Sequence, residues 1–132
     1  MKKIVIDTNF LLIPFKFRVD IFSEFDRICS FNYRLYVFEQ SLNELKNIVE
    51  KQRGMDKRAA QFALKLIGLK NIQVIKTEQK NVDELIIENL AKDTVIATLD
   101  INLKKQVLEK GASAIILRKK KYLQIIERKL YK

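Results

Sequence analysis

The chain has 132 residues, of which 48% are hydrophobic, and this is enough for one domain with its own core. It contains no histidine and a single cysteine, which excludes catalysis by Ser-His-Asp or Cys-His arrangements, zinc sites of the Cys/His kind and an intramolecular disulfide. The 26 Lys and Arg against 16 Asp and Glu give a formal charge of +10, which fits a polyanionic partner but also the charged surface of a heat-adapted protein.

The N-terminal stretch predicts a protein without a targeting segment. After Lys2 and Lys3 the apolar residues stop at Asp7, and no run in the chain reaches about 18 apolar residues. We therefore expect a cytoplasmic protein that does not enter a membrane. The sparse glycines and the single proline leave no linker, so we expect one domain over residues 1–132.

Short β-type runs alternate with helical patterns along the chain, which is typical of βαβ units around a parallel sheet. Five strands are predicted, at residues 4–7, 34–38, 72–75, 94–99 and 113–117. The helices between them include an apolar stripe over residues 59–67, ended by Gly68, and a helix begun by Asn81 with Glu84. Residues 50–58 predict a charged loop in a helical hairpin. The fold class expected is α/β, with a five-stranded parallel sheet flanked by helices on both faces.

Four carboxylates stand where these elements begin or end. Asp7 and Asp100 each close an apolar strand, and in a parallel sheet both ends point to the edge where α/β proteins bind ligands. Glu44 and Asp83 lie in the first turns of helices that border this edge. Four carboxylates in one crevice repel one another and need cations, and oxygen ligands suit Mg²⁺ or Mn²⁺. The pattern predicts a metal-dependent phosphodiesterase.

Each carboxylate also has a purely structural interpretation. Asp7 and Asp100 are good helix N-caps, and Glu44 could be a solvated surface residue. Asn9 and Asn102 follow Asp7 and Asp100 by two residues. They could hold an acid in place or bind metal through water, or they could simply form turns. Agreement among the four acids favours the functional interpretation.

The order of these motifs resembles that of the PIN-domain ribonucleases. The matching elements are Asp7-Thr8-Asn9, Glu44-Leu45, Asp83 and Thr98-Leu99-Asp100. The C-terminal part of the chain looks most like the archaeal branch related to endonucleases that process small-subunit ribosomal RNA. One departure is Val82, where that branch often has a second acid, and this puts a supplementary metal ligand in doubt.

The resemblance implies a single PIN-like domain with an acidic pocket for one or two Mg²⁺ or Mn²⁺ ions. Asp7 would be the central ligand, with Glu44, Asp83 and Asp100 completing the catalytic site and Thr98 as an accessory polar residue. The activity implied is endoribonucleolytic cleavage of RNA in ribosomal RNA processing or ribosome biogenesis. Family members commonly pair, so a homodimer is possible.

The basic run Arg118-Lys119-Lys120-Lys121 follows the last predicted strand. We expect it to hold the RNA backbone, although a solvated chain end is an equal alternative. Two other functions stay open: a toxin-like PIN ribonuclease controlled by an antitoxin, and a non-catalytic RNA-binding factor in ribosome assembly.

Overall fold

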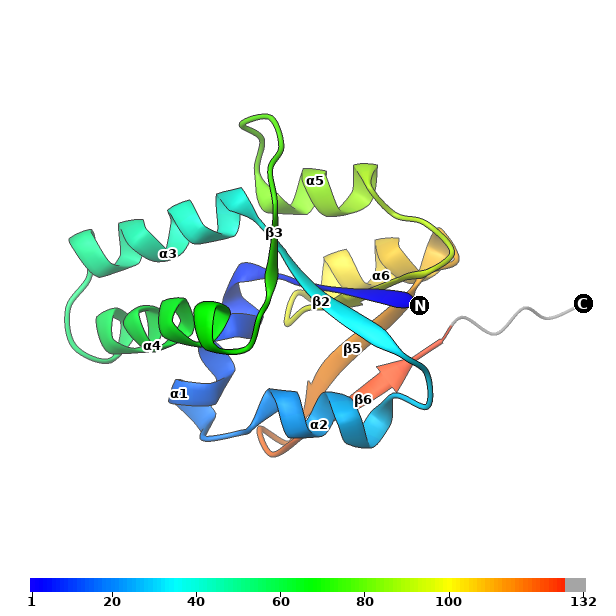
Figure 1. The fold of residues 1–132 in the computed structure, drawn as a ribbon, viewed down its shortest axis with the longest axis horizontal. Coiled ribbons are helices and arrows are strands. Elements are labelled where there is room, and N and C mark those ends of the chain that lie inside the picture. The colour runs from blue at the N-terminus through cyan, green and yellow to red at the C-terminus, as the bar shows by residue number, and fades with distance from the viewer. Residues whose placement is uncertain (128–132) are drawn as a thin grey trace, which may run out of the picture.

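A computed structural model of the chain describes residues 1–127 (Figure 1). Strands and helices alternate along most of this length. In chain order the elements are β1 (Lys2–Ile6), the 3₁₀ helix η1 (Thr8–Leu12), α1 (Ile13–Phe17), α2 (Ile21–Ile28), β2 (Tyr33–Phe38), α3 (Glu39–Lys51), α4 (Met55–Leu69), β3 (Gln73–Ile75), α5 (Val82–Glu88), β4 (Thr94–Ala97), α6 (Ile101–Glu109), β5 (Ser113–Arg118) and β6 (Tyr122–Ile126). None of these helices is long and apolar enough to cross a membrane.

One sheet runs through the molecule, with the strand order β3-β2-β1-β4-β5-β6. The first five strands are parallel, and β1 lies between β2 and β4, with Ile4 opposite Leu35 and Val95. The predicted α/β class and its parallel sheet are confirmed. Because the five strands run in one direction, the residues that follow β1 and β4 emerge at the same edge of the sheet.

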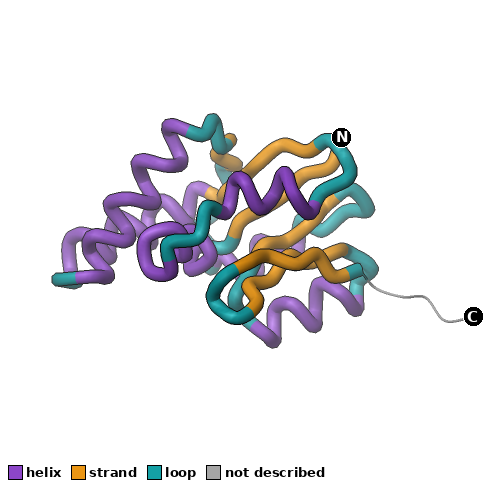
Figure 2. Tube along the Cα trace, turned by 90° about the horizontal axis from the view of Figure 1, so that it is seen from below, coloured by secondary structure: helices purple, strands orange, loops and turns teal. Residues whose placement is uncertain are grey.

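Helices cover both faces of the sheet and create two hydrophobic clusters (Figures 1 and 2). Along β1, Ile4 and Ile6 belong to the cluster that includes residues of α1, α2 and α4, whereas Val5 belongs to the cluster with α5 and α6. This follows from the alternation of side chains along a strand. A strand that is buried on both faces has to be apolar throughout, which explains the continuous run before Asp7.

The predicted number of strands was wrong, because a sixth strand, β6, pairs antiparallel with β5. The basic run is therefore not a chain end and does not follow the last strand: Arg118 ends β5, and Lys119, Lys120 and Lys121 form the turn of a hairpin. Lys119 and Lys120 have φ values of 52° and 55°. Tight hairpin turns need this conformation, and Asn and Gly usually supply it. A lysine pair gives no such signal in the sequence.

The α3–α4 hairpin extends beyond the sheet, as Figures 1 and 2 show. Its connection is shorter than predicted: α3 continues to Lys51 and α4 begins at Met55, so much of the expected loop over residues 50–58 is helical. Gly54 provides the tight connection with a φ of 68°. Gly68 does not end α4, which continues to Leu69. The hairpin carries Glu44 on the first half of α3.

Candidate active site

Asp7 is the most buried of the four predicted acids, with 7% of its surface exposed. It follows β1 and caps η1, where its Oδ1 accepts a hydrogen bond of 2.9 Å from the amide of Thr8. Its Oδ2 accepts one of 2.8 Å from the hydroxyl of Thr98. These are the only hydrogen bonds of this carboxylate within residues 1–127, and no ion pair compensates its charge there.

Thr98 joins the ends of the two central strands. Its hydroxyl donates to Asp7 and also accepts a hydrogen bond of 3.0 Å from the backbone amide of Asp100. Asp100 in turn caps α6, because its Oδ1 accepts hydrogen bonds from the amides of Asn102 and Leu103 at 2.8 and 3.1 Å. Its Oδ2 forms no hydrogen bond with the described residues. Thr98 therefore fixes the position of one acid and of the backbone that carries another.

The structure brings all four predicted acids to one pocket of about 330 Å³, here called the acid pocket. Asp7 and Asp100 come from the ends of the strands, Glu44 from α3 and Asp83 from the first turn of α5. The residues that line it are Asp7, Thr8, Asn9, Glu44, Asn81, Val82, Asp83 and Asp100. The structural and functional interpretations of Asp7 and Asp100 are thus compatible, because both residues cap helices while they line the pocket.

The accessory residues predicted from the sequence lie in three different places. Asn9 lines the acid pocket, and Thr98 is buried behind Asp7 with 1% exposure. Asn102 does not line the acid pocket and instead faces a neighbouring hollow between α5 and α6. Its backbone amide supports Asp100, so the contribution of Asn102 to the acid pocket is structural.

Sequence reasoning missed a contact between two hydroxyl groups, one from Thr8, which lines the acid pocket, and one from Ser41 on α3. The hydroxyls of Thr8 and Ser41 share a buried hydrogen bond of 2.8 Å, and Ser41 is completely buried. This contact fixes the start of α3, which carries Glu44, against η1. It joins residues 33 positions apart, and only the position of Ser41 one turn before Glu44 could have indicated it.

Three acids of the pocket, Asp7, Glu44 and Asp83, have raised pKa values. Burial raises the pKa of Asp7, and the charges of Asp83 and Asp100 raise it further. The pKa of Glu44 is raised by burial first and then by the charges of Asp7 and Asp83. Burial and the charge of Asp100 also raise the pKa of Asp83. A raised carboxyl pKa means that the charged form is disfavoured, so a bound cation would stabilise it.

The oxygen-rich chemistry of the acid pocket suits a hard divalent cation. It offers four carboxylates, and none of the ion pairs formed within residues 1–127 involves them. In their present conformations, however, no three Cys, Asp or Glu side chains within residues 1–127 are grouped so that they could hold a metal ion. Binding therefore requires side chains to reorient or waters to complete the coordination, and Mg²⁺ in proteins usually keeps several waters.

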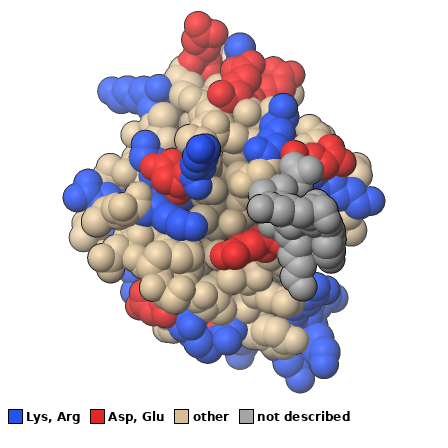
Figure 3. Space-filling model, turned by 90° about the vertical axis from the view of Figure 1, so that its right-hand side faces the viewer, with Lys and Arg blue, Asp and Glu red and all other residues tan. Residues whose placement is uncertain are grey.

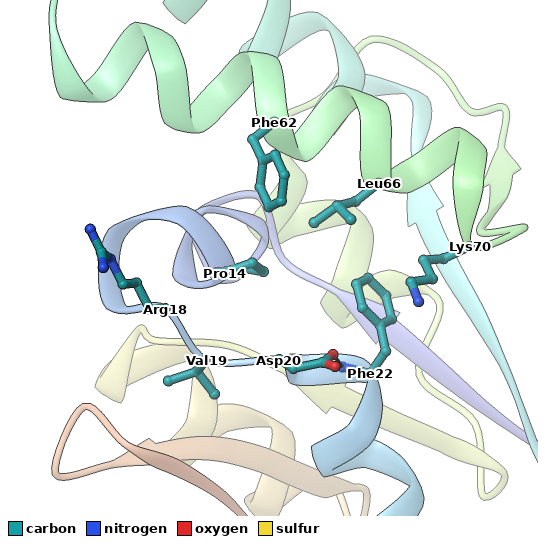
Figure 4. A pocket seen from close by; sticks show the side chains of 8 residues that line it. All are labelled: Pro14, Arg18, Val19, Asp20, Phe22, Phe62, Leu66 and Lys70. Atoms are coloured by element: carbon teal, nitrogen blue, oxygen red, sulfur yellow. Dashed lines mark hydrogen bonds between the residues drawn. The ribbon is translucent and has the colours of Figure 1, made fainter.

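A second cavity, of about 360 Å³, lies away from the acids, between α4 and the segment that joins α1 to α2 (Figure 4). Pro14, Phe22, Phe62 and Leu66 give it mainly apolar walls. Its single carboxylate, Asp20, caps α2 through the amides of residues 22 and 23. This groove lacks the groups needed for phosphodiester chemistry, so the acid pocket is the candidate active site.

Replacing Thr98 with Val removes the hydroxyl that positions Asp7 but keeps the shape of the side chain. We expect a loss of about 1–3 kcal/mol in the free energy of unfolding, because buried polar groups lose a partner. Metal affinity should fall by about 10- to 100-fold, as for other residues that support metal ligands. Calorimetric Mn²⁺ titration measures the second effect. Thr94→Val is a matched control, because Thr94 is a buried threonine at the other end of β4; equal Mn²⁺ affinities of the two variants would show that Thr98 does not support a metal site.

The fold and the acid pocket define a class of protein: a three-layer α/β domain with carboxylates gathered at the C-terminal edge of its parallel strands. A profile of the family described as PIN like domain matches residues 4–120. The chain belongs to the PIN-domain family.

Two curated relatives from archaea match most of the chain. Ribonuclease VapC4 of Methanocaldococcus jannaschii is 31% identical over 130 residues, covering 95% of this chain and 97% of that protein. Ribonuclease VapC9 of Archaeoglobus fulgidus is 30% identical over 109 residues, covering 81% of this chain and 76% of that protein.

Solved structures agree on the fold. The PIN domain endonuclease Utp24 superposes with a TM-score of 0.77 at 18% identity, over 97% of this chain and 92% of that one. A domain of a functionally unknown protein from Methanocaldococcus jannaschii gives a TM-score of 0.57 at 16% identity, over 89% of this chain and 92% of that one. Both identities are too low to show more than a shared fold.

Proposed function

We propose that the protein is a metal-dependent endoribonuclease that hydrolyses phosphodiester bonds of RNA at the acid pocket. The observation that carries the proposal is that one pocket, at the C-terminal ends of the parallel strands, is lined by all four acids: Asp7, Glu44, Asp83 and Asp100. The two archaeal relatives named as ribonucleases support the chemistry. Among the residues that line the acid pocket, only the carboxylates can exchange protons near neutral pH, so they are proposed as its acid and base groups.

Asp7 is proposed as the central metal ligand, because it is the most buried acid and its two oxygens are oriented by Thr8 and Thr98. Asp100 offers its Oδ2, and Glu44 and Asp83 extend from helices on either side. When bound, Mg²⁺ or Mn²⁺ lowers the pKa of a water molecule and neutralises charge on the phosphate. The carboxylates would hold the ion, and Asn9 at the pocket wall is placed to orient a water or a phosphate oxygen.

Basic residues near the acid pocket are proposed to bind the RNA backbone. Arg118 and Lys104 line a hollow together with Thr98 and Asp100, and Lys16 lines another hollow that also contains Asp100. On the opposite side of the molecule, where β1 begins, Lys and Arg are interspersed with Asp and Glu (Figure 3). Cations at the edge of the acid pocket would place the RNA backbone beside the carboxylates without reading its sequence.

Replacing Lys119, Lys120 and Lys121 of the β5–β6 turn with Gln should weaken binding to RNA of every sequence alike. The salt dependence of log K should flatten by about 0.7 for each lost phosphate contact. Fluorescence anisotropy at several salt concentrations measures both. Gln is preferred to Ala because the amino group of Lys120 lies 5.6 Å from the centre of the Phe17 ring, and Gln keeps part of the aliphatic side chain that leads there.

A matched control variant loses the same number of positive charges, three, at a different place on the surface. The three lysines are exposed and lie at the opposite end of the parallel strands: Lys3 near the start of β1, and Lys92 and Lys110 in the segments that lead into β4 and β5. If their replacement with Gln flattens the salt dependence as much as the β5–β6 variant does, the turn has no special role in binding.

The finer role is proposed to be ribosomal RNA processing, with a ribonuclease under the control of an antitoxin as the second candidate. The resemblance of the C-terminal part of the sequence to endonucleases that process small-subunit ribosomal RNA supports the first, and the two relatives named VapC support the second. A third possibility, a non-catalytic RNA-binding factor in ribosome assembly, is opposed by the intact set of four acids.

The test is cleavage of end-labelled, structured small-subunit ribosomal RNA in Mg²⁺ or Mn²⁺, with unrelated RNAs of the same length beside it. Internal cuts at a few positions in the ribosomal RNA support the first candidate. Cuts in all RNAs alike favour the toxin-like candidate, which predicts that a small protein encoded beside it suppresses the activity. Binding without any cleavage would leave the assembly factor.

A further inference from the structure

A second polar space adjoins the acid pocket. A hollow of about 470 Å³ lies between α5 and α6, and Asp83 and Asp100 line both it and the acid pocket. Its floor is apolar, formed by the buried Leu103 and the half-buried Ile87. We call it the amide hollow, because it is also lined by the side chains of Asn102 and Gln106.

The two amides are available to a ligand. Asn102 and Gln106 lie one helical turn apart on α6, so they are on the same face of the helix. Both residues are exposed, and neither side-chain amide forms a hydrogen bond within residues 1–127. The carboxylates around them are largely engaged, since Glu84 accepts a hydrogen bond from Asn81 and Glu88 accepts one from Lys80.

The charges on the two sides of α6 differ. Lys104 lies about 200° around the helix from both Asn102 and Gln106 and lines a different hollow together with Arg118. That side is basic and suits phosphates. Apart from its apolar floor, the amide hollow is lined only by amides and carboxylates, so it repels phosphates but accepts an uncharged flat group. A nucleobase has this chemistry: apolar faces and a polar edge.

We propose that the amide hollow binds one unstacked base of a single-stranded RNA substrate, beside the bond that is cut. The proposal rests on the proposed function, and it adds a specificity site to it. Single-stranded RNA exposes its base edges to side chains in this way. An amide offers a donor beside an acceptor, which matches an amino group beside a ring nitrogen, as in adenine and cytosine. Uracil presents an N3–H beside carbonyl oxygens, with which an amide can also pair, but the surrounding carboxylates disfavour those oxygens and favour the amino groups of adenine and cytosine.

The first experiment maps cut sites in a random-sequence RNA pool by sequencing the product ends. The wild type should show adenine or cytosine enriched over uracil at one fixed position next to the cut. Gln106→Leu should reduce this enrichment by about tenfold, the value of a good amide–base pair. Gln61→Leu is the matched control, because Gln61 is exposed on α4 and does not line the hollow. Equal enrichment in the two variants, or an enrichment of uracil, would overturn the proposal.

A second experiment does not require cleavage. The affinities of labelled hexamers of adenosine, cytidine and uridine are measured in Mg²⁺ by fluorescence anisotropy. Two proteins are compared: the Asp7→Asn variant and the double variant that also carries Gln106→Leu. The added substitution should weaken the adenosine and cytidine hexamers several-fold more than the uridine hexamer. Equal weakening of all three overturns the base site. A wild type that cuts no RNA contradicts the proposed function, while this binding measurement still decides the role of the amide hollow.

Discussion

Asp7→Asn should lower the rate of RNA cleavage by more than about 100-fold while the protein remains folded. Even residues that only support metal ligands cost about 10- to 100-fold when replaced, and Asp7 is the proposed central ligand. Asparagine keeps the size of the side chain, and its oxygen can still accept the hydrogen bond from the amide of Thr8, while its amino group can donate to the hydroxyl of Thr98. Removal of one charge also relieves repulsion among the remaining acids, so the metal-free variant should be at least as stable as the wild type.

The matched control for this substitution is Asp93→Asn. Asp93 lies just before β4, at the opposite edge of the sheet, so the change alters net charge equally and leaves the acid pocket intact. The measurement is the rate of cleavage of a labelled RNA at fixed Mg²⁺, with circular dichroism to check folding. Equal rates for Asp7→Asn and the wild type would show that Asp7 holds no catalytic metal, and would assign any observed cleavage to a contaminant.

Removal of divalent metal should abolish cleavage. Without a cation the four carboxylates of the acid pocket repel the RNA phosphate, and the chain has no histidine that could replace metal chemistry. Treatment with EDTA should reduce the rate by several orders of magnitude, and excess Mg²⁺ or Mn²⁺ should restore it, because bound ions contribute several kcal/mol to such transition states. The measurement is the rate before chelation, after it and after the ion is added back.

The chelated protein needs two checks. Circular dichroism should show a folded protein, since the two hydrophobic clusters of the core do not depend on the pocket. Addition of K⁺ at matched ionic strength should not restore cleavage, which separates a bound divalent ion from general screening. Undiminished cleavage in EDTA would contradict a metal-dependent mechanism.

The strand pattern and the four acids could be predicted from the sequence because both depend on local signals. Apolar runs ending in Asp7 and Asp100 mark buried parallel strands, and parallel strands place their ends at one edge. Asn81 accepts a hydrogen bond of 2.9 Å from the amide of Glu84 and so confirms the predicted start of α5 beside Asp83. The catalytic roles of these acids stay predictions.

Features that depend on tertiary packing could not be predicted. The turn between β5 and β6 uses lysines with positive φ, so β6 had no recognisable turn before it. Phe62 fits the apolar stripe of α4, yet it is 40% exposed because it lies at the rim of the groove in Figure 4. The hydroxyl contact between Thr8 and Ser41 also requires the folded chain. Periodicity identifies a helix face without specifying what covers it.

The central claim is that the acid pocket holds the catalytic divalent ion. The most direct test is a crystal of the wild-type protein soaked in Mn²⁺, with anomalous diffraction data collected above the manganese absorption edge. We predict an anomalous peak in the acid pocket within ligating distance of Asp7, and its loss in Asp7→Asn crystals soaked in the same way. A well-ordered pocket without a peak, or manganese bound only at other sites, would contradict the claim.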